Sequence, residues 1–181
     1  MNNKKYIQMI KGFIALIITV ALLYTGQALW QSYAIDLPLD KALNEVDGVE
    51  KVAWDTGSSF NDTVIINVKL RDIDNLQKTY KEIKEKINLT LNGKKYSLEI
   101  ADDRSQELEQ AYYDIHYYVQ KSIADGDFPS LEAKVREKAE MIGAEAKVYV
   151  DEQNIYLQFT KKDNSLFAVI GRHFDRIGGE L

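Results

Sequence analysis

The chemistry open to this sequence is limited first by the side chains that it contains. Its 181 residues include two histidines and no cysteine. Without cysteine the chain has no disulfide, no thiolate nucleophile and no cysteine-based zinc or iron–sulfur site. The histidines, His116 and His173, belong to no His-Glu-x-x-His pattern, the spacing that places two imidazoles on one zinc ion. We therefore expect neither a metal site nor a cofactor.

Paired carboxylates are the remaining catalytic possibility. Two acids flanking a sugar bond suffice for glycoside hydrolysis, and the candidate pairs are Asp102/Asp103 and Asp125/Asp127. Both pairs lie in predicted turns, where aspartate is common because its side chain accepts hydrogen bonds from nearby backbone N–H groups. The sequence also has no glycine-rich phosphate loop and no Gly-x-Ser-x-Gly motif. We expect no catalytic residue, and we predict that the protein is not an enzyme.

Four tyrosines fall within seven residues of a helix predicted over residues 107–123. Tyrosine rings combine a large contact area with a polar tip and are enriched at interfaces. The simpler interpretation is that two modules enclose this helix and bury both of its faces. The alternative is an exposed interaction surface for a protein partner or a glycan strand. That surface would consist of Tyr113, His116, Tyr117 and Tyr118.

An uncharged run over residues 12–30 predicts a membrane anchor. As a helix this run would span about 28 Å, close to the roughly 30 Å of a hydrocarbon core. Lys4, Lys5 and Lys11 precede it, which places the N-terminus in the cytoplasm and residues 31–181 outside the cell membrane. A cleaved signal peptide and a buried core helix are the alternatives. The residues expected to contact the lipid bilayer are Phe13, Leu16, Val20, Leu23, Tyr24 and Trp30.

The charge distribution argues against nucleic acid as a partner. All 28 acidic residues and 20 of the 23 basic residues follow residue 30. The predicted exported region is therefore acidic, and an acidic surface repels a phosphate backbone. A protein partner or self-association is the expected mode of interaction.

Two modules follow the predicted anchor and its connector. The first reads as helix, strand, strand, helix and strand, with its clearest strand at residues 64–70, where apolar and polar side chains alternate. The second reads as helix, strand, strand and a last helix at residues 165–177, whose apolar residues would be Phe167, Ile170, Phe174 and Ile177. The predicted organisation is a cytoplasmic N-terminus (1–11), an anchor (12–30), a connector (31–38), a first module (39–101), a linking Tyr-rich helix (102–128) and a second module (129–181).

The predicted fold class is α+β. It comprises an N-terminal transmembrane helix followed by small antiparallel or mixed sheets with packed helices, arranged as two α-β-β-α-like modules. The second helix of the first module has the length of a crossover that would return the third strand to the same sheet.

The first module resembles a known family. The order of ALNEVDGVEKV, VIINVKL, LQKTYKEIKEKI and YSLEI is similar to that of ring-building-motif domains, which occur in bacterial secretion rings and in stage III sporulation channel proteins, often behind one transmembrane anchor. This resemblance of architecture covers residues 39–101 and implies self-assembly in the envelope, although a shared fold does not itself establish function.

The expected function is therefore that of a single-pass, membrane-anchored extracytoplasmic domain, acting as a non-enzymatic interaction or assembly module in a bacterial cell envelope. The alternative is an envelope sensor or ligand-binding domain that uses the Tyr-rich helix, which would require a concave pocket.

Overall fold

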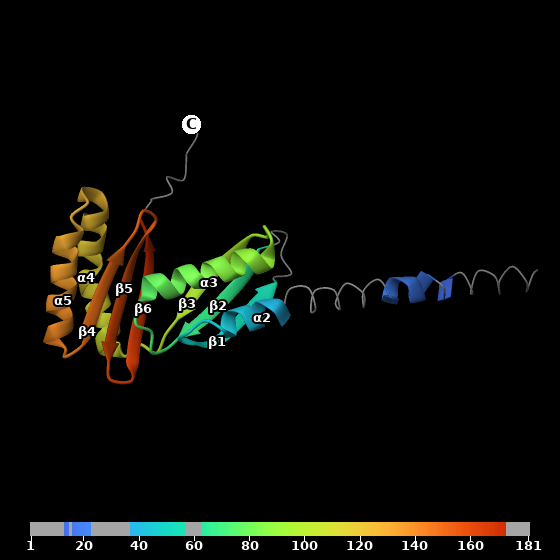
Figure 1. Cartoon of the computed structure of the whole chain (residues 1–181), viewed down its shortest axis with the longest axis horizontal. Helices are drawn as coiled ribbons and strands as arrows, with labels where there is room; N and C mark the ends of the chain where they lie inside the picture. The colour runs from blue at the N-terminus through green and yellow to red at the C-terminus, as the bar shows by residue number, and fades with distance from the viewer. Residues whose placement is uncertain (1–12, 15, 23–36, 57–62, 173–181) are drawn as a thin grey trace, which may run out of the picture.

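The computed structural model describes residues 13–14, 16–22, 37–56 and 63–172. Its described part is α+β, as predicted, with two three-stranded sheets and helices packed on them (Figure 1). The helices are α2 (Leu37–Asn44), α3 (Leu76–Leu91), α4 (Gln106–Asp125) and α5 (Phe128–Met141). The strands are β1 (Val49–Thr56), β2 (Val64–Leu70), β3 (Tyr96–Ala101), β4 (Glu145–Val150), β5 (Asn154–Lys161) and β6 (Asn164–Gly171).

The predicted transmembrane helix is wrong. Within the described ranges, no helix combines the length and the apolar character that crossing a membrane requires. Phe13, Leu16 and Val20 are helical with exposed side chains, whereas the other anchor candidates, Leu23, Tyr24 and Trp30, lie outside the described residues. The prediction relied on the uncharged composition of the run, and the helical residues described there, 13–14 and 16–22, are fewer than the roughly 20 that a span needs. The localisation drawn from this run stays a prediction.

The first sheet has the order β1-β2-β3, and its element order is the one predicted for residues 39–101. β1 pairs antiparallel with β2, and β2 pairs parallel with β3. α3 provides the crossover that parallel neighbours need. Asn75 caps its N-terminus, and the side chain of Asn75 accepts a hydrogen bond from the backbone N–H of Lys78 at 2.9 Å.

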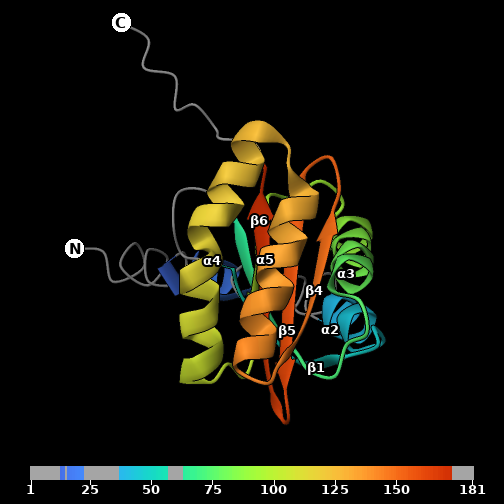
Figure 2. The same ribbon diagram turned by 90° about the vertical axis from the view of Figure 1, so that its left-hand side faces the viewer.

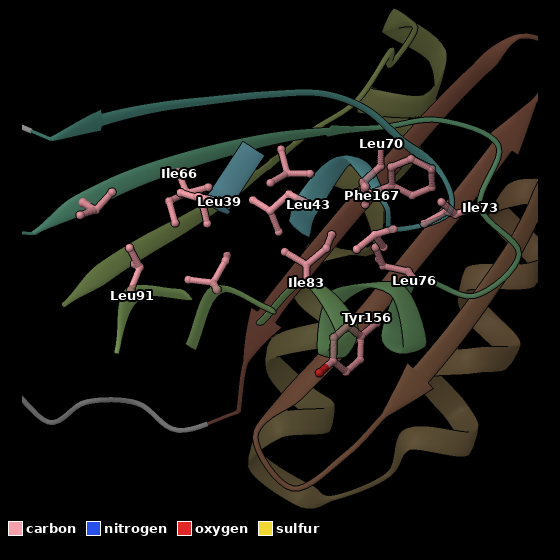
Figure 3. Packing of buried hydrophobic residues seen from close by; sticks show 14 residues of the cluster. Leu39, Leu43, Ile66, Leu70, Ile73, Leu76, Ile83, Leu91, Tyr156 and Phe167 are labelled. Atoms are coloured by element: carbon pink, nitrogen blue, oxygen red, sulfur yellow. The ribbon is translucent and has the colours of Figure 1, made fainter. Parts of the chain in front are cut away.

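The core of this first half lies between the sheet and the two helices that cover one of its faces. Leu39 and Leu43 of α2, Ile66 of β2 and Ile83 of α3 are fully buried there (Figure 3). The burial follows from alternation along β2, whose even-numbered residues face the helices while Ile65 points to the other, open face. The alternating pattern that predicted this strand is therefore the pattern that fills the core.

The second sheet has helices packed on both of its faces (Figure 1). Its order is β4-β5-β6 with every pairing antiparallel. Figure 1 shows α4 and α5 on one side of it and α3 on the other, and Figure 2 shows α4 and α5 side by side in front of it. Along β5, Leu157 and Phe159 join the core beneath α4 and α5, while Tyr156 joins the core of the first half. Figure 3 shows Tyr156 and Phe167 reaching into that first core.

The predicted helix at residues 165–177 is also wrong, because β6 occupies its described part. The helical spacing of Phe167 and Ile170 coincided with a continuous apolar run, which is equally typical of a strand buried on both faces. Leu166 packs beneath α4 and α5, and Phe167 packs into the first core. A two-residue turn at Lys162, with φ 54°, returns the chain so that β6 pairs with β5. Phe174, Ile177 and His173 lie outside the described residues.

Buried hydrogen bonds join the two halves. Gln158 of β5 is 3% exposed; its amide nitrogen donates to the carbonyl oxygen of Ile73 at 2.7 Å, and its amide oxygen accepts from the backbone N–H of Leu76 at 3.2 Å. Leu76 opens α3, so its N–H has no partner within the helix. These bonds connect the two modules, and α4 packs into the second core.

Candidate functional site

Helix α4 is positioned by capping groups at both ends. Ser105 accepts a hydrogen bond from the backbone N–H of Leu108 at 3.4 Å, and Gly126 ends the helix with φ 78°. Two acidic residues, Glu107 and Glu109, occupy the first turn, where the partial positive charge of a helix N-terminus favours them. The helix therefore has well-defined ends and presents a fixed outer face.

That outer face carries exposed aromatic rings. Tyr113 is 76% exposed and Tyr117 is 77% exposed. They are separated by four residues and therefore lie next to each other on the helix surface. The opposite face is buried in the second core through Leu108, Ala111, Ile115, Val119 and Ser122. The simpler interpretation, in which both faces are enclosed, is wrong because the first half covers the other side of the second sheet and leaves α4 as an outer layer.

The four residues singled out from the sequence are all exposed in the structure, and we call them the tyrosine surface: Tyr113, His116, Tyr117 and Tyr118. The Tyr117 and Tyr118 rings meet edge to face with centroids 6.5 Å apart, and His116 meets the half-buried Tyr112 in the same way at 6.2 Å. Edge-to-face pairs restrain ring motion and favour a defined arrangement. Tyr113 and Tyr117 form the centre of this surface, with His116 and Tyr118 flanking it.

The charged residues beside the tyrosine surface are paired locally. Gln110 donates to the Asp114 carboxylate at 2.8 Å and Lys138 of α5 donates to it at 3.3 Å; these two hydrogen bonds lower the pKa of Asp114. Lys121 pairs with Asp125 one turn further along, at 3.0 Å. Asp114 and Lys121, which border the rings, are therefore both paired.

A pocket of about 340 Å³ lies between α4 and α5. Its size is at the lower end of ligand-binding cavities. The charged groups in its wall are each paired, Asp114 with Lys138 and Glu107 with Lys161, and the apolar part of the wall includes Met141 and Ile142. A second pocket, of about 320 Å³, also lies between α4 and α5, with Tyr118 and Lys121 in its wall. The ligand-binding alternative could use either concavity.

A second polar constellation, which the sequence did not reveal, centres on Asp151 in the turn between β4 and β5. Its carboxylate accepts hydrogen bonds from the Tyr156 hydroxyl at 2.9 Å and from the backbone N–H groups of Gln153 and Asn154, and it pairs with Lys81 of α3 at 2.9 Å. Burial alone would raise the pKa of Asp151, but Lys81 and the hydrogen bonds outweigh burial and hold that pKa well below its usual range. The spacing of Asp151 and Asn154, three residues apart between two apolar runs, is the signal that could have identified it.

The partners of Asp151 indicate a structural role. Burial raises the pKa of the Tyr156 hydroxyl to about 12, and its bond to the carboxylate acts in the same direction. An open pocket of about 400 Å³ lies beside this constellation, with Tyr80 and Lys84 in its wall. Throughout the described ranges, every buried side-chain nitrogen and oxygen has a hydrogen-bond partner. Asp151 therefore shapes the turn and ties α3 to the second sheet.

The carboxylate pairs considered for catalysis have structural partners. The Asp102 side chain is 2% exposed and bonds the Arg104 guanidinium at 2.8 Å and the backbone N–H of Phe167 at 2.8 Å. Asp103 pairs with Lys69 at 2.8 Å and with Arg71 at 2.9 Å. These contacts connect the end of β3 to β6 and to β2.

The second pair lies between the two outer helices. Asp125 pairs with Lys121 and accepts from the backbone N–H of Asp127, and Asp127 caps α5 by accepting from the backbone N–H of Ser130. Among the residues that the structure places, no three histidines or carboxylates gather where they could hold a metal ion.

Comparison with known proteins gives no match to a protein family, a curated protein or a solved structure. The resemblance of residues 39–101 to ring-building-motif domains therefore stays a prediction. The tyrosine surface is the candidate functional site on the strength of its own geometry.

Proposed function

We propose that this protein is a non-enzymatic interaction module that binds a protein partner through the tyrosine surface of α4. The observation that supports this most directly is the exposure of Tyr113 and Tyr117 on one helical face. Both rings contribute little to the core on which α4 packs, since the residues buried there lie on the opposite face. The two rings are therefore available to bind a partner without loss of contacts in the core.

The physical character of these side chains suits a protein interface. Tyrosine is among the residues that most often dominate binding energy at interfaces. It loses little conformational entropy when a partner immobilises it, because its ring is rigid and only two dihedral angles are restrained. On α4 the helix backbone and the Tyr117–Tyr118 contact already restrict these rings, so binding would require little further ordering.

The neighbouring outer helix provides an internal comparison. The exposed face of α5 carries the ion pairs Glu132–Arg136 and Lys134–Glu137, of which the second measures 2.6 Å. Such pairs at helical spacing are typical of a face in contact with water. The aromatic character of α4 is therefore a property of one helix and not of the outer layer as a whole.

Site-specific photocrosslinking in cells of the native organism tests this function. A photoreactive phenylalanine derivative is placed at position 113, and at position 89 as a control, because Leu89 of α3 has the same 76% exposure on the other side of the second sheet. We expect discrete higher-mass adducts from position 113 and none from position 89. No adduct from position 113, or the same adducts from both positions, would contradict the proposed function.

A further inference from the structure

We infer that the partner of the tyrosine surface is a second copy of this chain, which binds with its α4 antiparallel to the first α4 across a two-fold axis near Ile115. This inference rests on the proposed function and identifies its partner. It follows from the arrangement of residues along the exposed face of α4, which is close to a palindrome.

The palindrome is centred on Ile115. Tyr113 and Tyr117 lie two residues before and after this position. Gln110 and Gln120, five residues before and after it, flank the tyrosines on opposite sides and do not pair with each other. An isologous dimer requires such a pattern, because residue i of one copy contacts residue j of the other and residue j contacts residue i. An antiparallel pair of α4 helices therefore brings each Tyr113 against Tyr117 of the second copy.

Charge is compatible with this pairing. Helical periodicity places Glu109 and Gln120 on one side of the two tyrosines, and Gln110 and Lys121 on the other side. A two-fold axis perpendicular to both helices brings each side of the tyrosines next to the same side in the second copy. The order of the residues along that side is reversed. Glu109 then faces Gln120 of the second copy, and Lys121 faces Gln110. Among these four residues no like charges meet, although the chain as a whole carries a net charge of −5, and the antiparallel helix dipoles also attract.

The available area fits a weak dimer. A tyrosine side chain buries 150–250 Å² at most, so four rings that begin about three-quarters exposed would remove on the order of 600 Å² of aromatic surface from water. The glutamines and the flanking residues add to this. This area is below that of standard specific interfaces, about 1,200 Å² or more, and is in the range of weak, transient complexes. We expect a dissociation constant on the order of 1–100 µM.

Complementary charges at the two tyrosines provide a sharp test. In an antiparallel pair, position 113 of one copy faces position 117 of the other, so Tyr113→Glu and Tyr117→Lys are each disruptive alone but compatible when mixed. A parallel pair would instead place each introduced charge against an unchanged tyrosine. The measurement is the mass of the full chain by light scattering in a nonionic detergent, which covers the exposed apolar side chains among residues 13–22.

We expect the unmodified chain to dimerise and each single variant to raise the dissociation constant at least about tenfold. The mixture of the two variants should dimerise within about threefold of the unmodified chain. Leu89→Ala is the control and should dimerise normally, and circular dichroism checks that every variant is folded. A monomeric unmodified chain, or a mixture that stays monomeric, would overturn the inference.

This outcome is separable from that of the proposed function. If position 113 crosslinks to a different protein in cells while the purified chain is monomeric, the second copy is contradicted and the interaction surface stands. If position 113 gives no adduct in cells and the mixture of variants fails to dimerise, both are contradicted.

Discussion

At the scale of single residues, two side chains connect the halves of the molecule and perform no chemistry. Gln158 satisfies two backbone groups of the segment that opens α3, and Asp151 joins the β4–β5 turn to Lys81. A buried polar group costs free energy unless it is hydrogen-bonded, and both residues are fully engaged. Their value to the protein lies in fixing how α3 packs on the second sheet.

Replacing Gln158 by leucine should destabilise the fold by about 2–4 kcal/mol, because the Ile73 carbonyl and the Leu76 N–H would be buried without partners. Equilibrium unfolding in denaturant measures this change in the free energy of unfolding. Gln153→Leu, at an exposed position in the β4–β5 turn, is the control and should have little effect. Equal effects of the two substitutions would show that the hydrogen bonds of Gln158 contribute nothing.

Asp151 makes stability depend on pH in a definite direction. Its folded-state pKa lies below the unfolded value, so its charge stabilises the fold above the unfolded pKa of about 3.9 and this stabilisation is lost as pH falls toward the folded pKa. The difference in unfolding free energy between the unmodified chain and Asp151→Asn should therefore shrink by about 1 kcal/mol between pH 7 and pH 3. Glu152→Gln is the neighbouring control. A pH-independent difference for Asp151→Asn would contradict this account.

At the scale of helices and strands, the sequence predicted the elements that bury only one of their faces. The alternation along residues 64–70 predicted β2 with the observed bounds. β6 could not be recognised in the same way, because a strand buried on both faces has no polar alternation. Its two faces are defined only once α4 and α5 lie on one side and α3 on the other, which is a tertiary property.

Gly48 is the turn position at which a side chain would be most harmful. Its φ of 84° is unfavourable for other residues, and an added Cβ would lie 2.1 Å from Cγ2 of Ile73. Gly48→Ala should cost about 2 kcal/mol or more, which is roughly 5 °C in Tm for a chain of this size. Gly93→Ala is the matched control, since Gly93 has φ 91° and open space around it. Equal losses of Tm would contradict the role of the contact with Ile73.

The residues of the candidate site could be predicted from the sequence, but the exposure of their side chains could not. Four tyrosines on one predicted helix identified the residues, but their exposure depended on whether a second layer covered α4. That question was decided by Tyr156 and Phe167, which direct the other face of the second sheet toward the first core. Single-sequence periodicity contains no information about which of two apolar faces meets which neighbour.

At the scale of the whole molecule, the layers place α4 on the outside with its aromatic face uncovered. α4 and α5 cover one face of the second sheet, while the first half covers the other face (Figure 1). The tyrosine surface is consequently a feature that the monomer does not use. Its proposed role is to complete an assembly of two copies.

Truncating both central tyrosines should therefore leave the monomer intact. In dilute solution, Tyr113→Ala/Tyr117→Ala should change the free energy of unfolding by less than about 0.5 kcal/mol, as exposed substitutions usually do. Tyr156→Ala, at a ring that is 1% exposed, should cost about 3–5 kcal/mol. A large loss of stability in the double variant would indicate a structural role for these rings.

The most direct test of the central claim is the sedimentation of the full chain in detergent over about 1–100 µM, a range that brackets reversible association. The comparison is between the unmodified chain and the Tyr113→Ala/Tyr117→Ala variant. The account predicts that the unmodified chain shifts from monomer to dimer as concentration rises and that the double variant stays monomeric. The same sedimentation profile for both chains, whether monomeric or associated, would contradict it.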